Sequence, residues 1–196
     1  FIPIVEDTQL SQILGIDNLL TAVKTVAARR IEKIDLALMG ENYFISQVEF
    51  GIASSKARQM GFFSSLRGMS AIDYNLKIRV DDSYDMDITC LGGTVTNSRA
   101  TSSSNSTIAN PTDGFLDLMI LERMSKLDVM KYKPDIANGI LEHIPGTSVI
   151  KCKQVEFLEP RGFPLTIAGR TFAKVPAVIS IIQKQLRMIV GKNRTF

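Results

Sequence analysis

The sequence predicts an α+β domain built mainly from antiparallel strands, a β-sandwich or barrel-like body with helical inserts. Residues 70–81 alternate apolar and polar side chains, which is typical of a half-buried antiparallel strand. Residues 165–190 are rich in β-branched and aliphatic side chains, broken by turn residues into short runs. Helical periodicity is confined to a few segments, so strands dominate the expected fold.

Each element follows from its local pattern. Helices are expected at residues 9–15 and 17–30, with Asp17 as the N-cap of the second and Arg29–Arg30 near its C-terminus. Further helices are expected at 52–67 and at 126–143, the latter interrupted at Pro134. Strands are expected at 33–39, 43–50, 70–81, 84–91, 114–122 and 148–158, with three or four more in 165–190, divided at Gly169, Pro176 and Lys184–Gln185. The Ser-, Thr- and Asn-rich residues 97–112 predict a loop.

Composition excludes several classes of function. The 196 residues carry a net charge of only +3, with few clustered basic residues, so no nucleic-acid partner is expected. The single histidine, His143, lacks the partners that a catalytic triad or a zinc site requires. Cys90 and Cys152 are expected to be buried free thiols in a reducing, cytoplasmic setting, and the alternative of a disulfide between them has no support in the sequence. No signal peptide or apolar run of about 18 residues is visible, so we expect no transmembrane helix.

The beginning of the chain predicts a longer parent protein. Residue 1 is Phe rather than Met, and Ile2-Pro3-Ile4-Val5 has the pattern of the end of a strand. We therefore expect residues 1–30 to be the junction with a preceding domain and residues 31–196 to form the β-rich domain.

Four short patterns follow one another along the chain. The first is residues 2–10 with Ile13-Leu14-Gly15-Ile16, and the second is Ile34-Asp35-Leu36 with residues 41–44 and Phe50-Gly51. The third is residues 109–117, Ala-Asn-Pro-Thr-Asp-Gly-Phe-Leu-Asp, and the fourth is Ala168-Gly169-Arg170 between two apolar runs.

In this order the patterns resemble the C-terminal domain of the diacylglycerol, sphingosine and ceramide kinase family. The resemblance covers almost the whole chain, although no single motif decides it. It implies a lipid-holding antiparallel β domain preceded by a Rossmann-like nucleotide-binding domain, which would lie before Phe1. It also implies ATP-dependent phosphorylation of a lipid hydroxyl.

The resemblance places an ATP-contacting glycine loop at residues 5–8. The family has Gly-Thr-Gly-Asn there, whereas this chain has Val5, Glu6, Asp7 and Thr8. Glycines allow backbone N–H groups to approach phosphate, and two carboxylates repel a triphosphate unless a metal bridges them. The scaffold of the loop matches, and its phosphate-contacting residues do not.

The resemblance also implies a structural magnesium ion in the third pattern. The carboxylate of Asp113 and the backbone carbonyls of Asn110 and Phe115 would hold it, because oxygen ligands suit a hard cation. The alternative is that Asp113-Gly114 is a plain turn before a strand, since Asp and Gly favour turns.

The fourth pattern takes the place of the family's Asp-Gly-Glu segment, whose carboxylate is the proposed base. Here Ala168 and Arg170 flank Gly169, and neither an alanine nor a guanidinium accepts a proton near neutral pH. Arg170 is a candidate for holding a lipid phosphate in bidentate fashion.

The family's lipid cleft lies beneath the helix expected from residue 52 onward. Candidate lining residues are flexible or flat apolar side chains, which suit an acyl chain: Met60, Phe62, Phe63, Leu66 and Met69. The alternative is that they are ordinary core residues.

Three functions are therefore open from the sequence. The first is a catalytically impaired lipid-kinase-like domain that binds a diacylglycerol- or sphingoid-like lipid or a partner, in peripheral contact with a membrane. The second is part of an active lipid kinase in which Glu6, Asp7 or Asp113 holds magnesium, and ATP binding would then require the upstream domain. The third is a structural module that forms a homo-oligomer.

Overall fold

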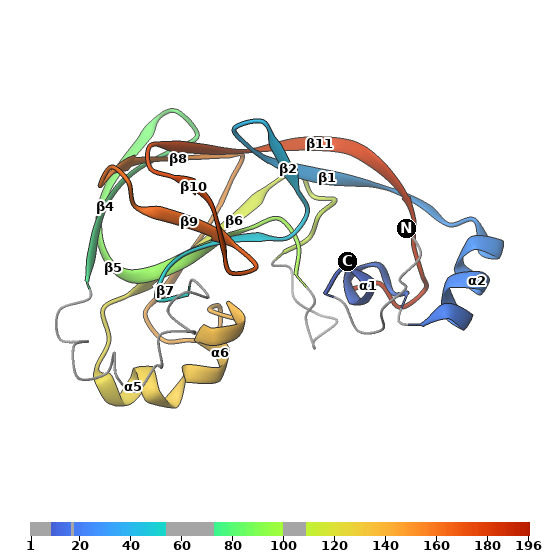
Figure 1. Cartoon of the computed structure of the whole chain (residues 1–196), viewed down its shortest axis with the longest axis horizontal. Coiled ribbons are helices and arrows are strands. Elements are labelled where there is room, and N and C mark those ends of the chain that lie inside the picture. Colours follow the sequence, from blue (N-terminus) through green and yellow to red (C-terminus); the bar gives the residue numbers. More distant parts are fainter. Residues whose placement is uncertain (1–8, 17, 54–72, 100–108) are drawn as a thin grey trace.

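The computed structural model describes residues 9–16, 18–53, 73–99 and 109–196. Eleven strands form one antiparallel sheet with the order β10-β9-β3-β5-β4-β8-β11-β1-β2, while β6 pairs with β5 and β7. The sheet curls into a half-barrel with few helices (Figure 1), which confirms the expected fold class.

Helices occupy little of the described chain: α1 (Gln9–Leu14), α2 (Leu19–Ala28), α5 (Lys126–Lys131) and α6 (Lys133–Asn138). The strands are β1 (Ile31–Met39), β2 (Asn42–Phe44), β3 (Gln47–Gly51), β4 (Tyr74–Val80), β5 (Tyr84–Thr96), β6 (Leu116–Glu122), β7 (Thr147–Cys152), β8 (Gln154–Glu159), β9 (Pro164–Ile167), β10 (Arg170–Lys174) and β11 (Ala177–Ile189).

The long strand β5 joins the two halves of the sheet. Its first half pairs with β4, and its second half, from Gly92 onward, pairs with β3 and β6. A Cβ atom on Gly92 would lie 2.4 Å from the carbonyl oxygen of Phe50, and the residue has a φ of +145°. Only glycine fits this close approach, which lets β5 change partners without breaking.

The main core fills the inside of the curled sheet. The rings of Phe50 and Phe157 meet edge to face there, with centroids 5.2 Å apart. A second cluster lies on the outer face, where Met119 and Leu121 of β6 pack against Val129 of α5 and Ile136 of α6. Helices α5 and α6 therefore cover the outer face of the sheet beside β6 (Figure 1).

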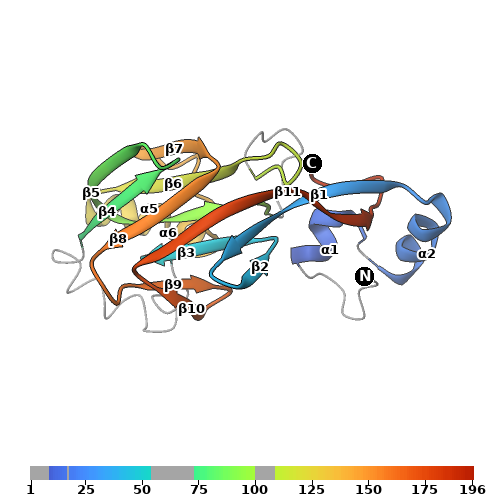
Figure 2. The ribbon, with the colours of Figure 1, turned by 90° about the horizontal axis from the view of Figure 1, so that it is seen from above.

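Strands β1 and β11 form a long two-stranded ribbon that carries α1 and α2 away from the half-barrel (Figure 2). The end of the ribbon packs against the helices through Leu14, Ile16, Ala22, Ile34 and Val190. Among the described segments, no helix combines the length and the apolar character needed to cross a bilayer.

Several element boundaries differ from the sequence prediction. The N-cap of α2 is Asn18, whose side chain and Thr21 bond each other's backbone N–H groups, and Asp17 lies outside the described residues. The strand expected at 43–50 is divided into β2 and β3. The helix expected at 126–143 is interrupted as predicted, but it ends at Asn138 because Gly139 adopts a left-handed cap.

Two strands are longer or more continuous than expected. β5 extends to Thr96, and β11 runs through Lys184–Gln185 by means of a bulge in which Lys184 has a φ of +54°. The helix expected at 52–67 lies almost entirely outside the described residues.

The two cysteines are buried free thiols, as predicted from the sequence. Burial raises the pKa of Cys90 to about 11 and that of Cys152 to about 12. Both thiols therefore remain protonated at neutral pH.

Candidate functional site

A row of four polar side chains crosses the outer face of the sheet. Gln47 of β3 lies opposite Thr96 of β5, Thr96 lies opposite Asp117 of β6, and Asp117 lies opposite Lys151 of β7. Directly opposed residues of antiparallel strands share a face, so the four side chains point the same way. We call them the polar row, and all except Lys151 are buried.

The hairpin between β9 and β10 lies at the β3 end of the polar row. Thr166 of β9 is opposite Glu49 of β3, which lies two residues from Gln47, the β3 member of the polar row. The Thr166 hydroxyl donates to the carbonyl oxygen of Glu49 (3.1 Å), which fixes the two strands at this point. The fold therefore places β9, the strand that leads into the fourth sequence pattern, beside β3, which carries one end of the polar row.

The third sequence pattern lies at the opposite end of the row. The ammonium nitrogen of Lys151 is 2.8 Å from Oδ2 of Asp113 and 3.2 Å from Oδ1 of Asp117. The other oxygen of Asp113 accepts the N–H of Phe115 (3.0 Å), and the other oxygen of Asp117 accepts the N–H of Ala109 (2.7 Å). Both carboxylates are thus held by Lys151 and by the backbone around the turn.

The electrostatics of this cluster follow from its partial burial. Burial raises the pKa of the Asp117 carboxyl, although the Ala109 N–H and Lys151 both oppose the rise. Burial by itself lowers the pKa of Lys151, but its contacts with Asp113 and Asp117 outweigh this effect and raise the pKa. Lys151 therefore carries its charge at neutral pH.

The buried Asp35 of β1 holds the turn of the third pattern through hydrogen bonds. Oδ2 of Asp35 accepts the N–H of Gly114 (2.8 Å), and Oδ1 accepts the N–H of Lys184 in the β11 bulge (2.6 Å). Its own backbone N–H donates to the carbonyl of Pro111 (2.7 Å), and its carbonyl accepts the Asn97 side-chain amide (3.0 Å). Asp35 belongs to the second sequence pattern, where it was expected only as part of a strand. Its charge between the apolar residues Ile34 and Leu36 was the signal that could have indicated a buried structural carboxylate.

The oxygen atoms expected to coordinate magnesium at Asp113 would have to rearrange before they could do so. Both oxygens of Asp113 already have partners, and the Asn110 carbonyl lies 3.4 Å from the Asp113 N–H. Within the described residues, no group of three or more His, Cys, Asp or Glu side chains has a metal-binding arrangement. Magnesium at this turn remains a prediction.

The hairpin at Ala168 and Gly169 contains no carboxylate. Both residues have positive φ values, +44° and +86°, as in the two-residue turns that join twisted strands. Arg170 begins β10 and is exposed, with its backbone opposite Ile167. The flanking strands are confirmed, and the role of the guanidinium stays a prediction.

The other predicted site residues lie outside the described part of the chain: the loop positions Glu6, Asp7 and Thr8, and the lipid-cleft candidates Met60, Phe62, Phe63, Leu66 and Met69.

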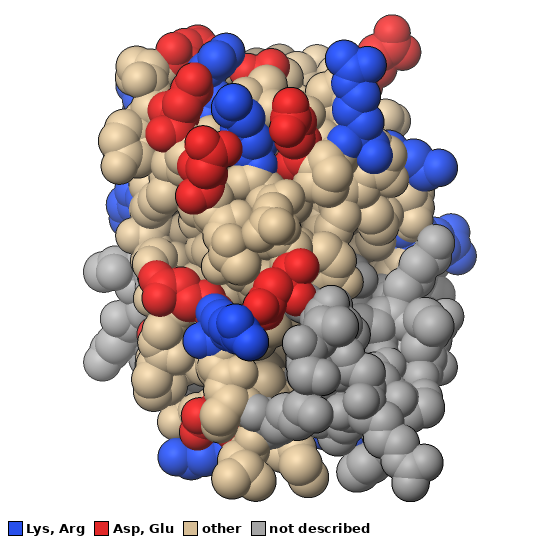
Figure 3. Space-filling model, turned by 90° about the vertical axis from the view of Figure 1, so that its left-hand side faces the viewer, with Lys and Arg blue, Asp and Glu red and all other residues tan. Residues whose placement is uncertain are grey.

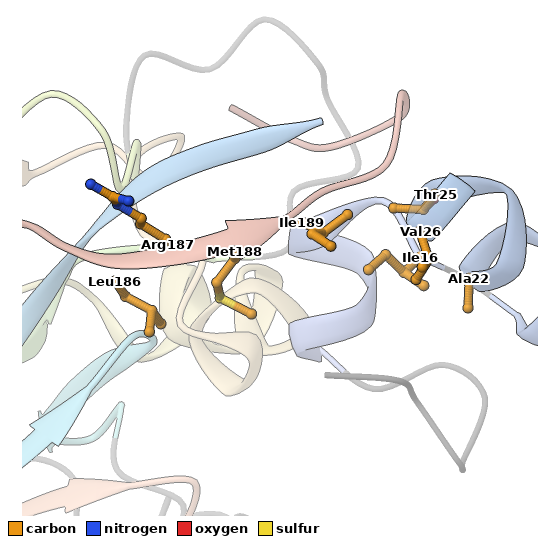
Figure 4. A pocket seen from close by; sticks show the side chains of 8 residues that line it. All are labelled: Ile16, Ala22, Thr25, Val26, Leu186, Arg187, Met188 and Ile189. Atoms are coloured by element: carbon orange, nitrogen blue, oxygen red, sulfur yellow. The ribbon is translucent and has the colours of Figure 1, made fainter. Parts of the chain in front are cut away.

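A separate cavity of about 470 Å³ lies between α2 and the end of β11. Its walls include Ile16, Ala22, Val26, Leu186 and Met188, and side chains of the helix and of the strand face it from two sides (Figure 4). The outer side of α2 is also apolar and exposed, with Leu19, Leu20 and Val23 more than half accessible to solvent. This end of the molecule is apolar, in contrast to the polar row.

The surface around β4 and β5 carries mixed charge. Acidic and basic side chains alternate there (Figure 3), and Arg79 pairs with Asp85 at 2.7 Å and with Glu156 at 3.4 Å. Such alternation does not form the basic stripe that nucleic-acid backbones require.

Comparison with known proteins identifies the family. The model of the YegS C-terminal NAD kinase beta sandwich-like domain matches residues 52–190, which is well over half of the chain. The chain belongs to this family. The resemblance to lipid kinases inferred from the four sequence patterns is thereby confirmed.

Solved structures share the fold. Two structures from Bacillus anthracis str. Sterne, both named as diacylglycerol kinases, superpose with TM-scores of 0.73 and 0.71 at 18% and 17% sequence identity. Each alignment covers 98% of this chain but only 68% and 66% of the other chain, so this domain spans about two thirds of their length. No curated protein matches the chain significantly in sequence.

Proposed function

We propose that this chain is the β-rich domain of a lipid-kinase-like protein, that it binds a lipid, and that its phosphoryl transfer is impaired. The observation that carries the proposal is the hairpin at Ala168–Arg170, which offers no proton acceptor beside the polar row. A positioned base that accepts the proton of the lipid hydroxyl speeds phosphoryl transfer, so loss of the base impairs the reaction even where positioning is kept.

The carboxylate of Glu49, on the strand paired with β9, is a poor substitute for the missing base. Glu49 lies on β3, opposite Thr166, and its side chain is only 5% exposed. Its Oε1 accepts the side-chain amide of Gln47 at 3.3 Å. A lipid hydroxyl above the sheet would have to displace this arrangement to reach the carboxylate.

The family match and the fold support a lipid as the ligand, because the chain shares its fold with two proteins named as diacylglycerol kinases. A diacylglycerol- or sphingoid-like lipid would be taken from a membrane by peripheral contact, in the cytoplasm. ATP and magnesium would be required only where a nucleotide-binding domain accompanies this one.

The test is phosphoryl transfer from labelled ATP to a mixed lipid extract by the full-length protein that contains this chain. The double variant Ala168→Asp/Arg170→Glu restores two carboxylates to the hairpin. Its matched control is Ala168→Asn/Arg170→Gln, which has nearly the same size and turn preference but cannot accept a proton. Lipid binding is measured in parallel by sedimentation with diacylglycerol-containing vesicles.

We expect no labelled lipid from the native protein or the control, labelled lipid from the double variant, and vesicle binding by all three. Labelled lipid from the native protein would show an active kinase with an unusual base. Absence of vesicle binding by all three proteins would remove lipid binding from the proposal and leave a structural module.

A further inference from the structure

Two carboxylates and one ammonium group meet where the third sequence pattern runs into the start of β6, beside the end of β7. Asp113 lies in the turn before β6, Asp117 lies within β6, and Lys151 reaches both from β7 at 2.8 Å and 3.2 Å. The register of the sheet places Lys151 opposite Asp117, so the base of the lysine side chain is fixed by backbone pairing.

One oxygen of each carboxylate is hydrogen-bonded to the backbone, so the other oxygen is the one that meets a cation. Asp117 is almost fully buried, and its Oδ2 is bonded to the Ala109 N–H. Oδ1 of Asp113 is bonded to the Phe115 N–H. The remaining oxygen of each carboxylate points to the same place, which the Lys151 ammonium occupies.

We propose that the Lys151 ammonium is the built-in cation of the Asp113–Asp117 pair and fixes this turn in place of a divalent metal ion. A magnesium ion requires near-octahedral oxygen ligands at about 2.0–2.1 Å, and an ammonium group in the same position excludes it by charge and by volume. An ammonium supplies three hydrogen-bond donors and needs no further ligands.

The partial burial of the cluster makes this cation important for stability. Asp117 pays a desolvation cost, as the upward shift of its pKa shows, and Lys151 offsets part of that cost. Among the ion pairs of the described residues, those of Asp113 and Asp117 are with Lys151, so removal of Lys151 leaves both carboxylates without that counter-charge. The vacated position then attracts a divalent cation, which neutralises both charges.

The experiment compares the native chain with Lys151→Met, which keeps the apolar stem and removes the charge. Free Mn²⁺ is titrated and followed by its electron paramagnetic resonance signal, and thermal unfolding is recorded in EDTA and in millimolar Mg²⁺. Lys174→Met is the matched control, because Lys174 is an exposed strand lysine on β10. The double variant Asp113→Asn/Lys151→Met tests whether any new binding depends on the turn.

We expect the native chain and the control to show no Mn²⁺ binding that depends on Asp113 and no response of Tm to Mg²⁺. Lys151→Met should bind Mn²⁺ at least about tenfold more tightly than the native chain, because a like charge has left the position. Its Tm should fall by about 4 °C in EDTA and recover in Mg²⁺. The double variant should lose the new binding.

Mn²⁺ binding by the native chain that disappears in Asp113→Asn would overturn the proposal, and that measurement stands even where Lys151→Met does not fold. Lys151→Arg keeps the charge and should behave as the native chain; tighter Mn²⁺ binding by this variant would also contradict the proposal. A Lys151→Met protein that is as stable in EDTA as the native chain and ignores both metals would do the same.

Discussion

Two tight turns lie at opposite ends of the polar row, and they differ in what holds them. The turn at Asp113–Gly114 is fixed by side chains from three strands, Asp35 of β1, Lys151 of β7 and Gln183 of β11. The turn at Ala168–Gly169 is fixed by the backbone pairing of β9 with β10. Both contain a glycine with a φ near +80°.

The difference explains which carboxylates the fold itself requires. At the first turn each carboxylate accepts backbone N–H groups, so the local structure depends on it whether or not chemistry takes place. At the second turn none of the described hydrogen bonds involves a side chain of Ala168 or Arg170. No described hydrogen bond of this hairpin therefore depends on a carboxylate, and the absence of one leaves the pairing of β9 with β10 in place.

Asp35→Ala should give the largest effect, because it removes the acceptor of two backbone N–H groups, the buried one of Gly114 and the partly buried one of Lys184. We expect the free energy of unfolding to fall by about 3 kcal/mol and Tm to fall by roughly 10 °C. Chemical denaturation and thermal unfolding measure it. Asp87→Ala on the exposed part of β5 is the control, with an expected change within about 0.5 kcal/mol. Equal stability of the two variants would show that the network around Asp35 is not needed.

Gly114→Ala should follow, with a loss of about 2 kcal/mol. Its φ is +80°, and the added Cβ would lie 2.4 Å from the Gln183 amide nitrogen, which donates to the Gly114 carbonyl at 3.2 Å. Gly162→Ala separates backbone strain from the steric clash with Gln183. Gly162 has a similar φ of +81°, but nothing lies within 4 Å of its added Cβ. That variant should lose only about 1 kcal/mol. A loss at Gly162 as large as that at Gly114 would attribute the whole effect to backbone strain.

The fold class was predictable because alternation and strand propensity act locally. The 70–81 pattern gave β4, and the apolar runs around Ala168–Arg170 gave the hairpin. Burial of Cys90 and Cys152 followed from their apolar neighbours. These features depend on residues that are close in the chain.

Features that depend on register were not predictable in the same way. Lys151 is 34 residues from Asp117, and only the pairing of β6 with β7 brings them together. The bulge that lets β11 continue past Lys184 depends on Asp35, 149 residues away. The apolar face of α2, although visible as a pattern, is exposed in this structure, because burial depends on what packs against the helix.

The smallest expected effect belongs to the second turn. Ala168 has a φ of +44°, which costs an alanine about 1 kcal/mol and suits asparagine or aspartate much better. Ala168→Asn should therefore stabilise the domain by about 0.5–1 kcal/mol, whereas Ala177→Gly, at the start of β11, should destabilise it by a similar amount. Denaturant titration resolves both. A loss of stability in Ala168→Asn would mean that the hairpin is held by more than its backbone. Ala168→Asp should gain the same stability as Ala168→Asn. In the kinase assay, activity can therefore be attributed to the carboxylate only where the aspartate variant is more active than the equally stabilised asparagine variant.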